Sequence, residues 1–283
     1  MKRMNIMLLL VLVAAAALFG CYQLWIHNNL DTVGPVITID EGILEVSVED
    51  PDSMLMQGVR AEDARDGDVT ADVLIESVYG INEHGETTVT YVAFDAAGNV
   101  TKAQRQIRYR DYHSPRFVLS GSLTYPYGRR FDLMENVGAI DVLEGDIRRR
   151  IHPTLISDTR SIDDEGVHQV KLQVTNSLGD TAQIVVPVEV YDPEWYNADV
   201  TLTEYLVYLE KGSRFDSRAY LKSFVVRGEP VDVSSEIPEE ISVDINSKVR
   251  VNEPGLYEVS YVLSQTVDAN TYTGMAKLIV IVE

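Results

Sequence analysis

The sequence concentrates its possible site chemistry in an acidic loop. Asp63, Asp66 and Asp68 lie within the stretch 61–70, and Asp95 follows in a later turn. Closely spaced carboxylates suit calcium, which takes six to eight oxygen ligands. The same spacing is typical of turns, in which Asp side chains accept hydrogen bonds from nearby backbone N–H groups. We expect structural turns and no metal site, with calcium as the alternative. The pattern recurs at Asp141, Glu144 and Asp146.

The histidines and the one cysteine do not form a set that catalysis or zinc binding requires. No two histidines have the HExxH spacing, and Cys21 lies in the N-terminal apolar segment. There is also no G-x-S-x-G elbow, P-loop or dinucleotide fingerprint. We therefore expect a protein that is not an enzyme and has no cofactor. On its strand, His168 is expected to face solvent. The histidines are His27, His84, His113, His152 and His168.

Two further groups of residues could bind a partner. The basic run 148–150 consists of three arginines, which could engage an acidic polymer, although we expect a solvated strand edge that prevents aggregation. Several aromatic side chains could stack on sugars, with core or junction packing as the other interpretation. These aromatic residues are Tyr125, Tyr127, Trp195 and Tyr196.

Length and charge limit the classes of function. The 283 residues allow two or three domains of roughly 100 residues each. A formal net charge of −20 argues against a nucleic-acid partner, because phosphate binding requires clustered Lys and Arg. Since Cys21 is the single cysteine, the rest of the chain has no disulfides and must be stabilised by burial.

The N-terminal segment 1–30 is expected to direct the chain to a membrane. Lys2 and Arg3 precede the uncharged stretch 4–30, which is long enough to span a bilayer with a cytoplasmic N-terminus. We expect an uncleaved, single-pass transmembrane helix with an extracytoplasmic C-terminal region. One alternative is a lipoprotein signal, because Leu18-Phe19-Gly20-Cys21 is similar to a lipobox and Cys21 would be lipidated. The other is a cleaved signal peptide.

Three similar segments follow. Gly85-Glu-Thr-Thr-Val-Thr-Tyr91 recurs as Gly166-Val-His-Gln-Val-Lys-Leu172 and as Gly255-Leu-Tyr-Glu-Val-Ser-Tyr261. Apolar residues at the fourth and sixth positions after each Gly indicate a strand buried on one face. The acidic block 61–70 also recurs, at 139–148, and each Gly strand leads to a turn and a closing strand. We call the segments 34–110, 111–192 and 196–283 repeats 1, 2 and 3.

The repeats resemble the tandem Ig-like domains of bacterial surface proteins, in particular the group related to the Ig-like domain of a pesticidal crystal protein. The resemblance rests on Pro35-Val-Ile-Thr-Ile39, on the acidic block 61–70 and on the stretch 85–99. Repeat 2 keeps the pattern with Glu144 for Asp66 and Asn176 for Asp95, and repeat 3 keeps mainly the Gly strand. The resemblance implies an Ig-like sandwich used as a spacer, adhesin or interaction domain. It implies no catalytic residues.

The sequence therefore predicts an all-β chain of three tandem Ig-like β-sandwich domains after an N-terminal transmembrane or signal helix. The function expected is that of a non-catalytic cell-surface structural or adhesion protein, which holds a binding surface away from the membrane. Its partners would be the membrane, through the N-terminal helix, and an unidentified protein or glycan. A carbohydrate- or peptide-binding module, or an accessory subunit of an envelope enzyme, is the alternative.

Overall fold

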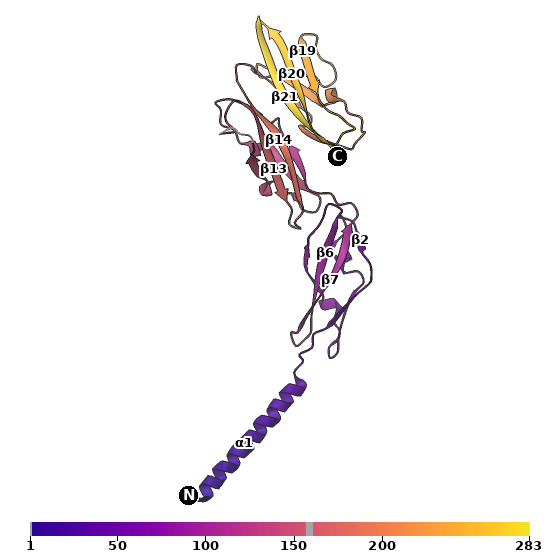
Figure 1. The fold of residues 1–283 in the computed structure, drawn as a ribbon, viewed down its shortest axis with the longest axis vertical. Helices are drawn as coiled ribbons and strands as arrows, with labels where there is room; N and C mark the ends of the chain where they lie inside the picture. Colours follow the sequence, from indigo (N-terminus) through magenta and orange to yellow (C-terminus); the bar gives the residue numbers. More distant parts are fainter. Residues whose placement is uncertain (1, 157–160) are drawn as a thin grey trace. The chain divides into compact units, whose positions relative to one another are not determined.

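The computed structural model describes residues 2–156 and 161–283, with the side chains of residues 2–5 and 26–29 left aside. It comprises an N-terminal helix, α1 (Lys2–Asn29), followed by strands and short 3-10 helices (Figure 1). The chain divides into two compact units, Met1–Asp111 and Tyr112–Glu283. The prediction of an all-β chain after an N-terminal helix is confirmed.

Unit 1 contains repeat 1 as two facing sheets. One sheet has the strand order β1-β3-β4 and the other has the order β2-β7-β6-β5. Its core includes Val59 and Ala61 from the first sheet and Val89, Tyr91 and Ile107 from the second. The strands are β1 (Val36–Ile39), β2 (Leu44–Val46), β3 (Val59–Asp63), β4 (Gly67–Asp68), β5 (Leu74–Tyr79), β6 (Glu86–Phe94) and β7 (Val100–Tyr109).

In unit 2, repeat 2 has the same two-sheet plan. The sheet orders are β11-β10-β8 and β12-β13-β14-β9, which match those of repeat 1 strand for strand. Residues of both sheets, among them Phe117, Ala139, Leu172 and Val186, form one core. The strands are β8 (Arg116–Leu119), β9 (Thr124–Pro126), β10 (Val137–Asp141), β11 (Gly145–Asp146), β12 (His152–Leu155), β13 (Gly166–Thr175) and β14 (Thr181–Tyr191).

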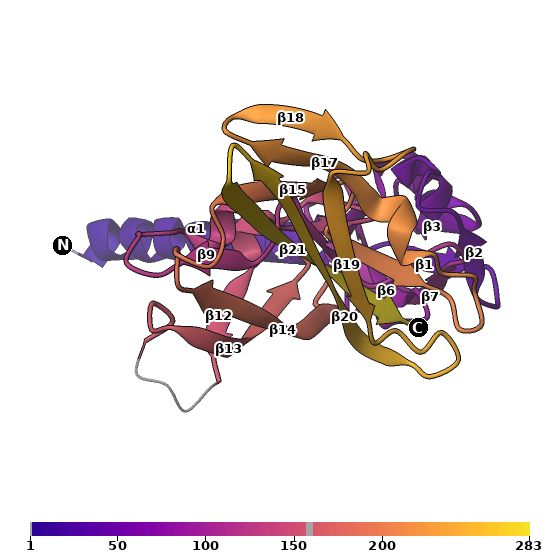
Figure 2. The same ribbon diagram turned by 90° about the horizontal axis from the view of Figure 1, so that it is seen from above.

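Repeat 3 forms a larger sheet of seven strands. Its order is β18-β17-β15-β21-β20-β19, and β16 also pairs with β21; the β17–β18 hairpin is at one end (Figure 2). Here β20 and β21 are longer than their counterparts and meet at a tight turn at Asp268 and Ala269, both of which have positive φ. The strands are β15 (Ala198–Leu202), β16 (Leu206–Leu209), β17 (Leu221–Val226), β18 (Glu229–Asp232), β19 (Ile241–Ser247), β20 (Gly255–Val267) and β21 (Asn270–Val282).

The second position after the repeated Gly has a structural role that the sequence pattern did not predict. His168 occupies this position in repeat 2 and is fully buried, so the expectation that it faces solvent was wrong. Its Nε2 lies 2.6 Å from the carbonyl oxygen of Asp164. The equivalent Thr87 and Tyr257 donate hydrogen bonds to the carbonyls of Tyr79 and Glu253. In each repeat this side chain is tethered to a backbone carbonyl that precedes it in the chain.

Within unit 2, repeats 2 and 3 share buried contacts. Leu206 and Ile279 of repeat 3 belong to the same apolar cluster as Phe117 of repeat 2. The hydroxyl of Tyr208 accepts a hydrogen bond from the Phe117 N–H at 2.9 Å. Lys277 of repeat 3 forms ion pairs with Glu189 of repeat 2 and Glu258 of repeat 3. An apolar patch and a buried ionic group therefore hold the two repeats together.

We expect this junction to make the stability of unit 2 sensitive to alkaline pH. Burial raises the pKa of Tyr208 to about 12. Burial acts to lower the pKa of Lys277, but Glu189 and Glu258 outweigh it, so the pKa of Lys277 is raised. Because the unfolded chain loses these protons first, the free energy of unfolding should fall as the pH rises above about 10. Urea unfolding of the full chain in mild detergent at pH 9 and pH 11 would measure the loss.

Tyr208→Phe serves as the control for that experiment. The variant lacks the hydroxyl that titrates, so its stability should fall less between the two pH values than that of the wild type. An equal fall in both proteins would contradict a role for Tyr208.

Candidate functional site

The acidic loop of repeat 1 contains the hydrogen bonds of structural turns. Asp63 ends β3 and is 7% exposed. Its Oδ1 accepts hydrogen bonds from the N–H groups of Arg65 and Asp66, at 2.8 and 3.0 Å. Asp68 Oδ1 accepts from the Thr70 N–H at 2.9 Å, and bonds from Thr70 lower the pKa of Asp68. Both carboxylates thus fix the backbone around the turn that Gly67 allows with its positive φ.

A second turn is tied to this loop. Asp66 Oδ2 accepts a hydrogen bond from the Ala96 N–H at 2.8 Å, which connects the β3–β4 turn to the β6–β7 turn. Asp95 is 8% exposed and accepts from the N–H and the side-chain amide of Asn99, both at 2.7 Å. Burial acts to raise the pKa of Asp95, but the bonds from Asn99 and from neighbouring backbone N–H groups lower it overall. Asp95 therefore stays ionised.

The carboxylates that meet in space are not the three that are adjacent in sequence. Ligand atoms of Asp31, Asp63 and Asp95 lie within 4.8 Å of one another, whereas Asp66 and Asp68 are not part of this cluster. Asp31 lies in the linker after α1, outside every repeated motif, so no sequence pattern could have identified it. Arg65 Nε lies 3.5 Å from Asp31 Oδ2 and partly neutralises the group. Three carboxylates could supply part of the oxygen shell that calcium requires.

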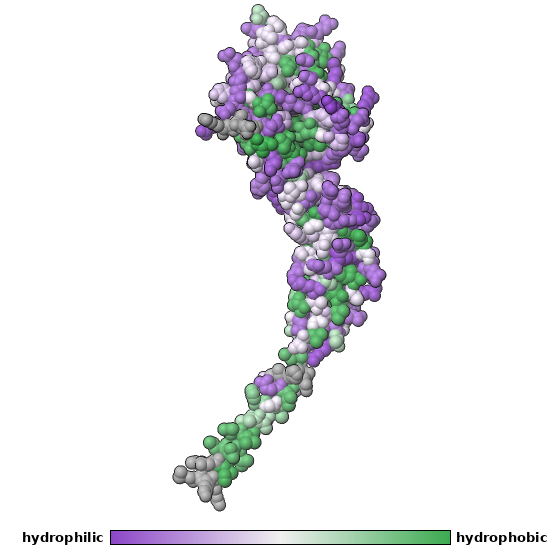
Figure 3. Space-filling model, in the orientation of Figure 1, coloured by the Kyte–Doolittle hydropathy of each residue, from purple (hydrophilic) through white to green (hydrophobic). Residues whose placement is uncertain are grey.

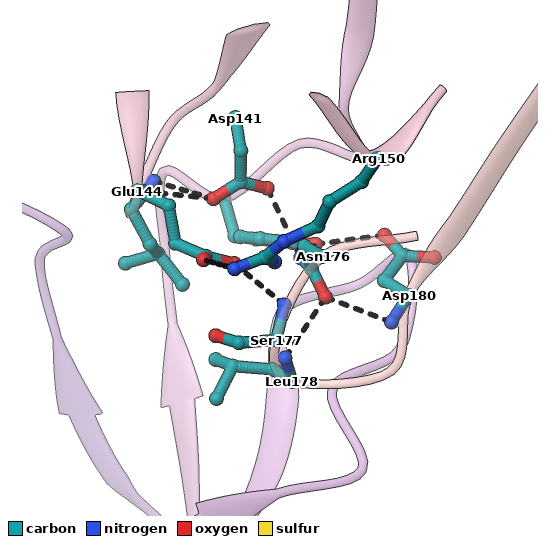
Figure 4. A network of polar contacts seen from close by, with 9 residues as sticks. Asp141, Glu144, Arg150, Asn176, Ser177, Leu178 and Asp180 are labelled. Carbon is teal, nitrogen blue, oxygen red and sulfur yellow. Dashed lines mark hydrogen bonds and ion pairs between the residues drawn. The ribbon is translucent and has the colours of Figure 1, made fainter. Parts of the chain in front are cut away.

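In repeat 2, an amide side chain takes the place of one of the carboxylates. Asp141, the counterpart of Asp63, is 1% exposed, and its Oδ1 accepts from the N–H groups of Leu143 and Glu144. Its Oδ2 accepts a hydrogen bond of 3.0 Å from the side-chain amide of Asn176, which replaces Asp95 (Figure 4). Asn176 also accepts from the N–H groups of Leu178 and Asp180. The buried carboxylate of repeat 2 thus has a hydrogen-bond donor where repeat 1 has another carboxylate.

Glu144 completes this network in the position of Asp66. Its Oε1 accepts a hydrogen bond from the Ser177 N–H at 2.6 Å, as Asp66 accepts from Ala96. Its Oε2 lies 2.8 Å from an Arg150 nitrogen, so Glu144 is paired with a cation as well (Figure 4). Although burial acts to raise the pKa of Glu144, these bonds lower it overall. The side chains of Asp141, Asn176 and Glu144 therefore all have hydrogen-bond partners, and they hold the two turns together.

Surface depressions beside the two acidic loops differ in charge. In repeat 1 the depression has a volume of about 580 Å³ and is lined by Asp66, Asp68 and Asp72 together with the exposed side chains of Leu74 and Phe94. In repeat 2 the corresponding depression of about 510 Å³ is lined by the three arginines of the run 148–150 together with Glu144, Asp146 and Ile147, so that both signs of charge are present.

The arginine run at 148–150 forms a short 3-10 helix, so the expectation of a strand edge was wrong. The run follows the β11 turn directly, as the 3-10 helix Thr70–Asp72 follows β4 in repeat 1. Arg148 lies 3.6 Å from Asp146, and Arg150 pairs with Glu144. Two of the three cations therefore have local carboxylate partners.

The aromatic candidates divide into buried and exposed residues. Tyr125 is 9% exposed and stacks on Phe131 with 3.9 Å between ring centroids. Tyr196 packs edge-on against Tyr191 at 5.1 Å. Tyr127 and Trp195, by contrast, are 52% and 58% exposed. Two of the four thus pack against neighbouring rings, and two are open to solvent.

The remaining candidates for catalysis are dispersed. His84 is exposed, His113 Nδ1 lies 2.9 Å from the Ser114 carbonyl, and His152 is on β12. The side chain of His27 lies outside the described residues. Among the residues that the structure describes, Asp31, Asp63 and Asp95 are the one group of at least three His, Cys, Asp or Glu side chains close enough together to share a metal ion.

Comparison with known proteins finds only distant similarities, all of them to solved structures. No protein-family model matches the sequence, and no curated protein matches it. The CBM51-2 and INT domains of Clostridium perfringens ZmpB, solved with GlcNAc, are 17% identical, with 55% of this chain and 26% of that chain covered and a TM-score of 0.22. The extracellular domain of protocadherin gamma B4 is 11% identical, with coverages of 88% and 49% and a TM-score of 0.20. The human desmocollin-1 ectodomain is 9% identical, with coverages of 70% and 47% and a TM-score of 0.17. The chain spans less than half of each structure, and these neighbours are all-β domains of the Ig-like, cadherin and carbohydrate-binding kinds.

Proposed function

We propose that this protein is a non-catalytic, membrane-anchored binding protein whose Ig-like domains lie outside the cytoplasm. The proposal rests on the length, apolar composition and exposure of α1. Its segment Ile6–Trp25 is long and apolar enough to cross a membrane, and none of it is buried against the rest of the chain (Figure 3). An apolar helix of this length without a protein partner finds its favourable environment in a bilayer.

The mode of anchoring follows from the charges around α1. Lys2 and Arg3 precede the apolar segment, which favours a cytoplasmic N-terminus and an extracytoplasmic C-terminal region. Cys21 lies exposed on α1, and its lipidation would be the alternative form of attachment. A signal peptide cleaved before the linker would give a third form, without an anchor.

The rest of the chain supports a binding or adhesion role. Its buried carboxylates Asp63 and Asp141 accept hydrogen bonds within turns. The net charge of −20 disfavours nucleic acid as a partner. The resemblance to the Ig-like group related to a pesticidal crystal protein agrees with a spacer, adhesin or interaction module.

Fractionation of cells that express the full chain tests the anchor. We expect the wild type to resist alkaline extraction of membranes and to be released by detergent. A variant with Leu10→Lys and Val13→Lys should lose this behaviour, since each charge at the centre of a helix costs about 2.5–3.5 kcal/mol. The mass of the membrane-bound protein separates the two attachments, because a lipoprotein would carry a lipid on Cys21 and a transmembrane protein would have an unmodified Cys21. A wild-type chain that alkali extracts would contradict the proposal.

Carbohydrate binding is the second candidate, and the exposed rings of Tyr127 and Trp195 favour it. Exposed aromatic rings offer flat apolar faces on which sugar rings can stack. Binding of the full chain in detergent to a glycan array, repeated with Trp195→Ala and with Tyr127→Ala, would test this role. Hits that both variants retain would exclude these two rings as the binding surface.

A further inference from the structure

Strand β19 is an end strand of the sheet in repeat 3. It lies beside β20 and, in the part of the chain that the structure describes, has no other strand as a neighbour. Its seven residues, Ile241–Ser247, pair with β20 in a continuous antiparallel register, from Ile241 opposite Gln265 to Ser247 opposite Val259. One long side of β19 is therefore not used within the sheet.

The register identifies the backbone groups on that free side. The N–H of Lys248 donates to the carbonyl of Glu258 at 3.5 Å, which continues the register beyond the end of β19. Because pairing alternates along an antiparallel ladder, the even-numbered residues bond to β20 and the odd-numbered residues point their N–H and C=O groups away. Among the described residues, no backbone hydrogen bond is formed by the N–H groups of Val243 and Ile245 on that side. Within the sheet, these groups have no partner strand.

The equivalent strands of the other repeats are protected against such pairing. In repeat 2, β12 has only four residues, and Pro153 stands opposite Leu172 on the odd, outward side. The ladder fixes that side, since the Ile156 N–H bonds to the Gln169 carbonyl. In repeat 1, the pairing of β5 is interrupted between Ile75 and Ser77. Prolines and irregularities of this kind keep edge strands from pairing with other chains.

Repeat 3 has neither a proline nor an interruption of the pairing at the equivalent position of β19. Leu172 and Tyr261 are both the sixth residue after the repeated Gly, and Tyr261 is paired with Ile245. Ile245 is therefore the counterpart of Pro153, with an N–H group where repeat 2 has none. This edge is therefore protected against strand pairing in repeats 1 and 2 and unprotected in repeat 3.

The charges near β19 define what can bind there. Asp244 is exposed at the middle of the strand, and Glu239 and Glu240 are exposed before it. The cations Lys248 and Arg250 follow the strand, and Arg250 is paired with Glu253. A second copy of this chain would place like charges against each other, and each copy carries a net charge of −20. An extended segment that carries Lys or Arg would be complementary.

We propose that the free edge of β19 binds an extended cationic segment of a partner protein by strand addition. The backbone groups of Val243 and Ile245 supply the hydrogen bonds, and Asp244 selects a basic residue on the partner strand. This inference rests on the proposed binding function and deepens it, because it assigns the binding surface and the class of partner.

The test uses the full chain in mild detergent and a labelled peptide of seven residues in which Val and Lys alternate. We expect the wild type to bind this peptide and Ile245→Pro to weaken binding at least about tenfold, because the proline removes one outward N–H where Pro153 is tolerated. Asp244→Lys should weaken binding by about fivefold. Glu229→Lys makes the same charge change on β18 at the other end of the sheet, and it should leave the affinity within about twofold.

A peptide with an N-methyl group on every amide separates strand pairing from charge attraction. This peptide keeps its lysines but cannot complete a ladder, so it should not bind, and the result does not depend on whether Ile245→Pro folds. Equal binding of both peptides, or equal weakening by Glu229→Lys and Asp244→Lys, would overturn the proposal. A wild-type dimer in sedimentation that Ile245→Pro abolishes would make a second copy the occupant and would also overturn it. None of these outcomes bears on membrane anchoring, which fractionation tests separately.

Discussion

Replacing Asn176 by Asp is expected to lower the free energy of unfolding of unit 2 by about 3 kcal/mol at neutral pH. Asn176 is 4% exposed, and its amide donates to Asp141 Oδ2 and to the Tyr112 hydroxyl, both at 3.0 Å. The substitution removes these donors and places a second carboxylate against a buried one. Urea unfolding of the full chain in mild detergent, followed by the fluorescence of Trp195, would measure the loss.

The pH dependence of the free energy of unfolding provides a second test of this prediction. The new carboxyl would have a raised pKa, because burial and the charge of Asp141 both favour its neutral form. A raised pKa makes the loss largest at neutral pH and smaller as the pH falls toward about 4. The reciprocal change in repeat 1, Asp95→Asn, should alter stability by less than about 1 kcal/mol, since it removes a charge from the Asp31 and Asp63 cluster. A loss for Asn176→Asp that does not depend on pH would contradict this electrostatic account.

Lys277→Met is expected to have a similarly large effect, again about 3 kcal/mol. The side chain of Lys277 is 13% exposed, and its Nζ lies 3.1 Å from each carboxylate oxygen of Glu258 and forms an ion pair with Glu189. Met fills much of the same volume but leaves the two carboxylates of Glu189 and Glu258 facing each other in a half-buried position. Denaturant unfolding of unit 2 within the full chain is the measurement.

A compensating variant distinguishes lost packing from unpaired charge. Lys277→Met combined with Glu189→Gln and Glu258→Gln has no uncompensated charge, and replacement of a whole buried ionic group by uncharged residues is often nearly neutral. The triple variant should therefore regain most of the lost stability. If it is as unstable as Lys277→Met alone, the side chain acts through packing and the ionic account is wrong.

The sequence predicted the strands of this chain well because burial alternates along them with a period of two. The Gly85, Gly166 and Gly255 segments become β6, β13 and β20, and their fourth and sixth residues are buried in every repeat. The fold class follows from such local patterns, which depend on neighbouring residues alone.

The errors arose where a side chain's environment depends on contacts outside the regular alternation of a strand. The sequence pattern placed His168 on a strand, but it did not reveal the Asp164 carbonyl that lies within hydrogen-bond distance of the buried His168 ring. It placed Asp63 in an acidic loop, but not beside Asp31, which is brought there by the path of the linker. It also gave no indication of Lys277 between Glu189 and Glu258. The contacts of Asp63 and Lys277 join residues that are far apart in sequence, and no spacing rule encodes them. The Asp164 carbonyl is only four residues from His168, but it lies in an irregular turn that the alternation of the strand does not describe.

In all three repeats, a strand near the start lies parallel to the last strand. Leu44 of β2 is opposite Ile107 of β7, Glu189 of β14 is opposite Thr124 of β9, and Leu206 of β16 is opposite Ile279 of β21. When a segment is stretched between its two ends, a parallel pair is pulled from opposite ends, and its hydrogen bonds are loaded together in shear instead of opening one after another. A chain held by a membrane at one end and by a partner at the other would therefore resist tension, with its survival under force set by the rate of unfolding.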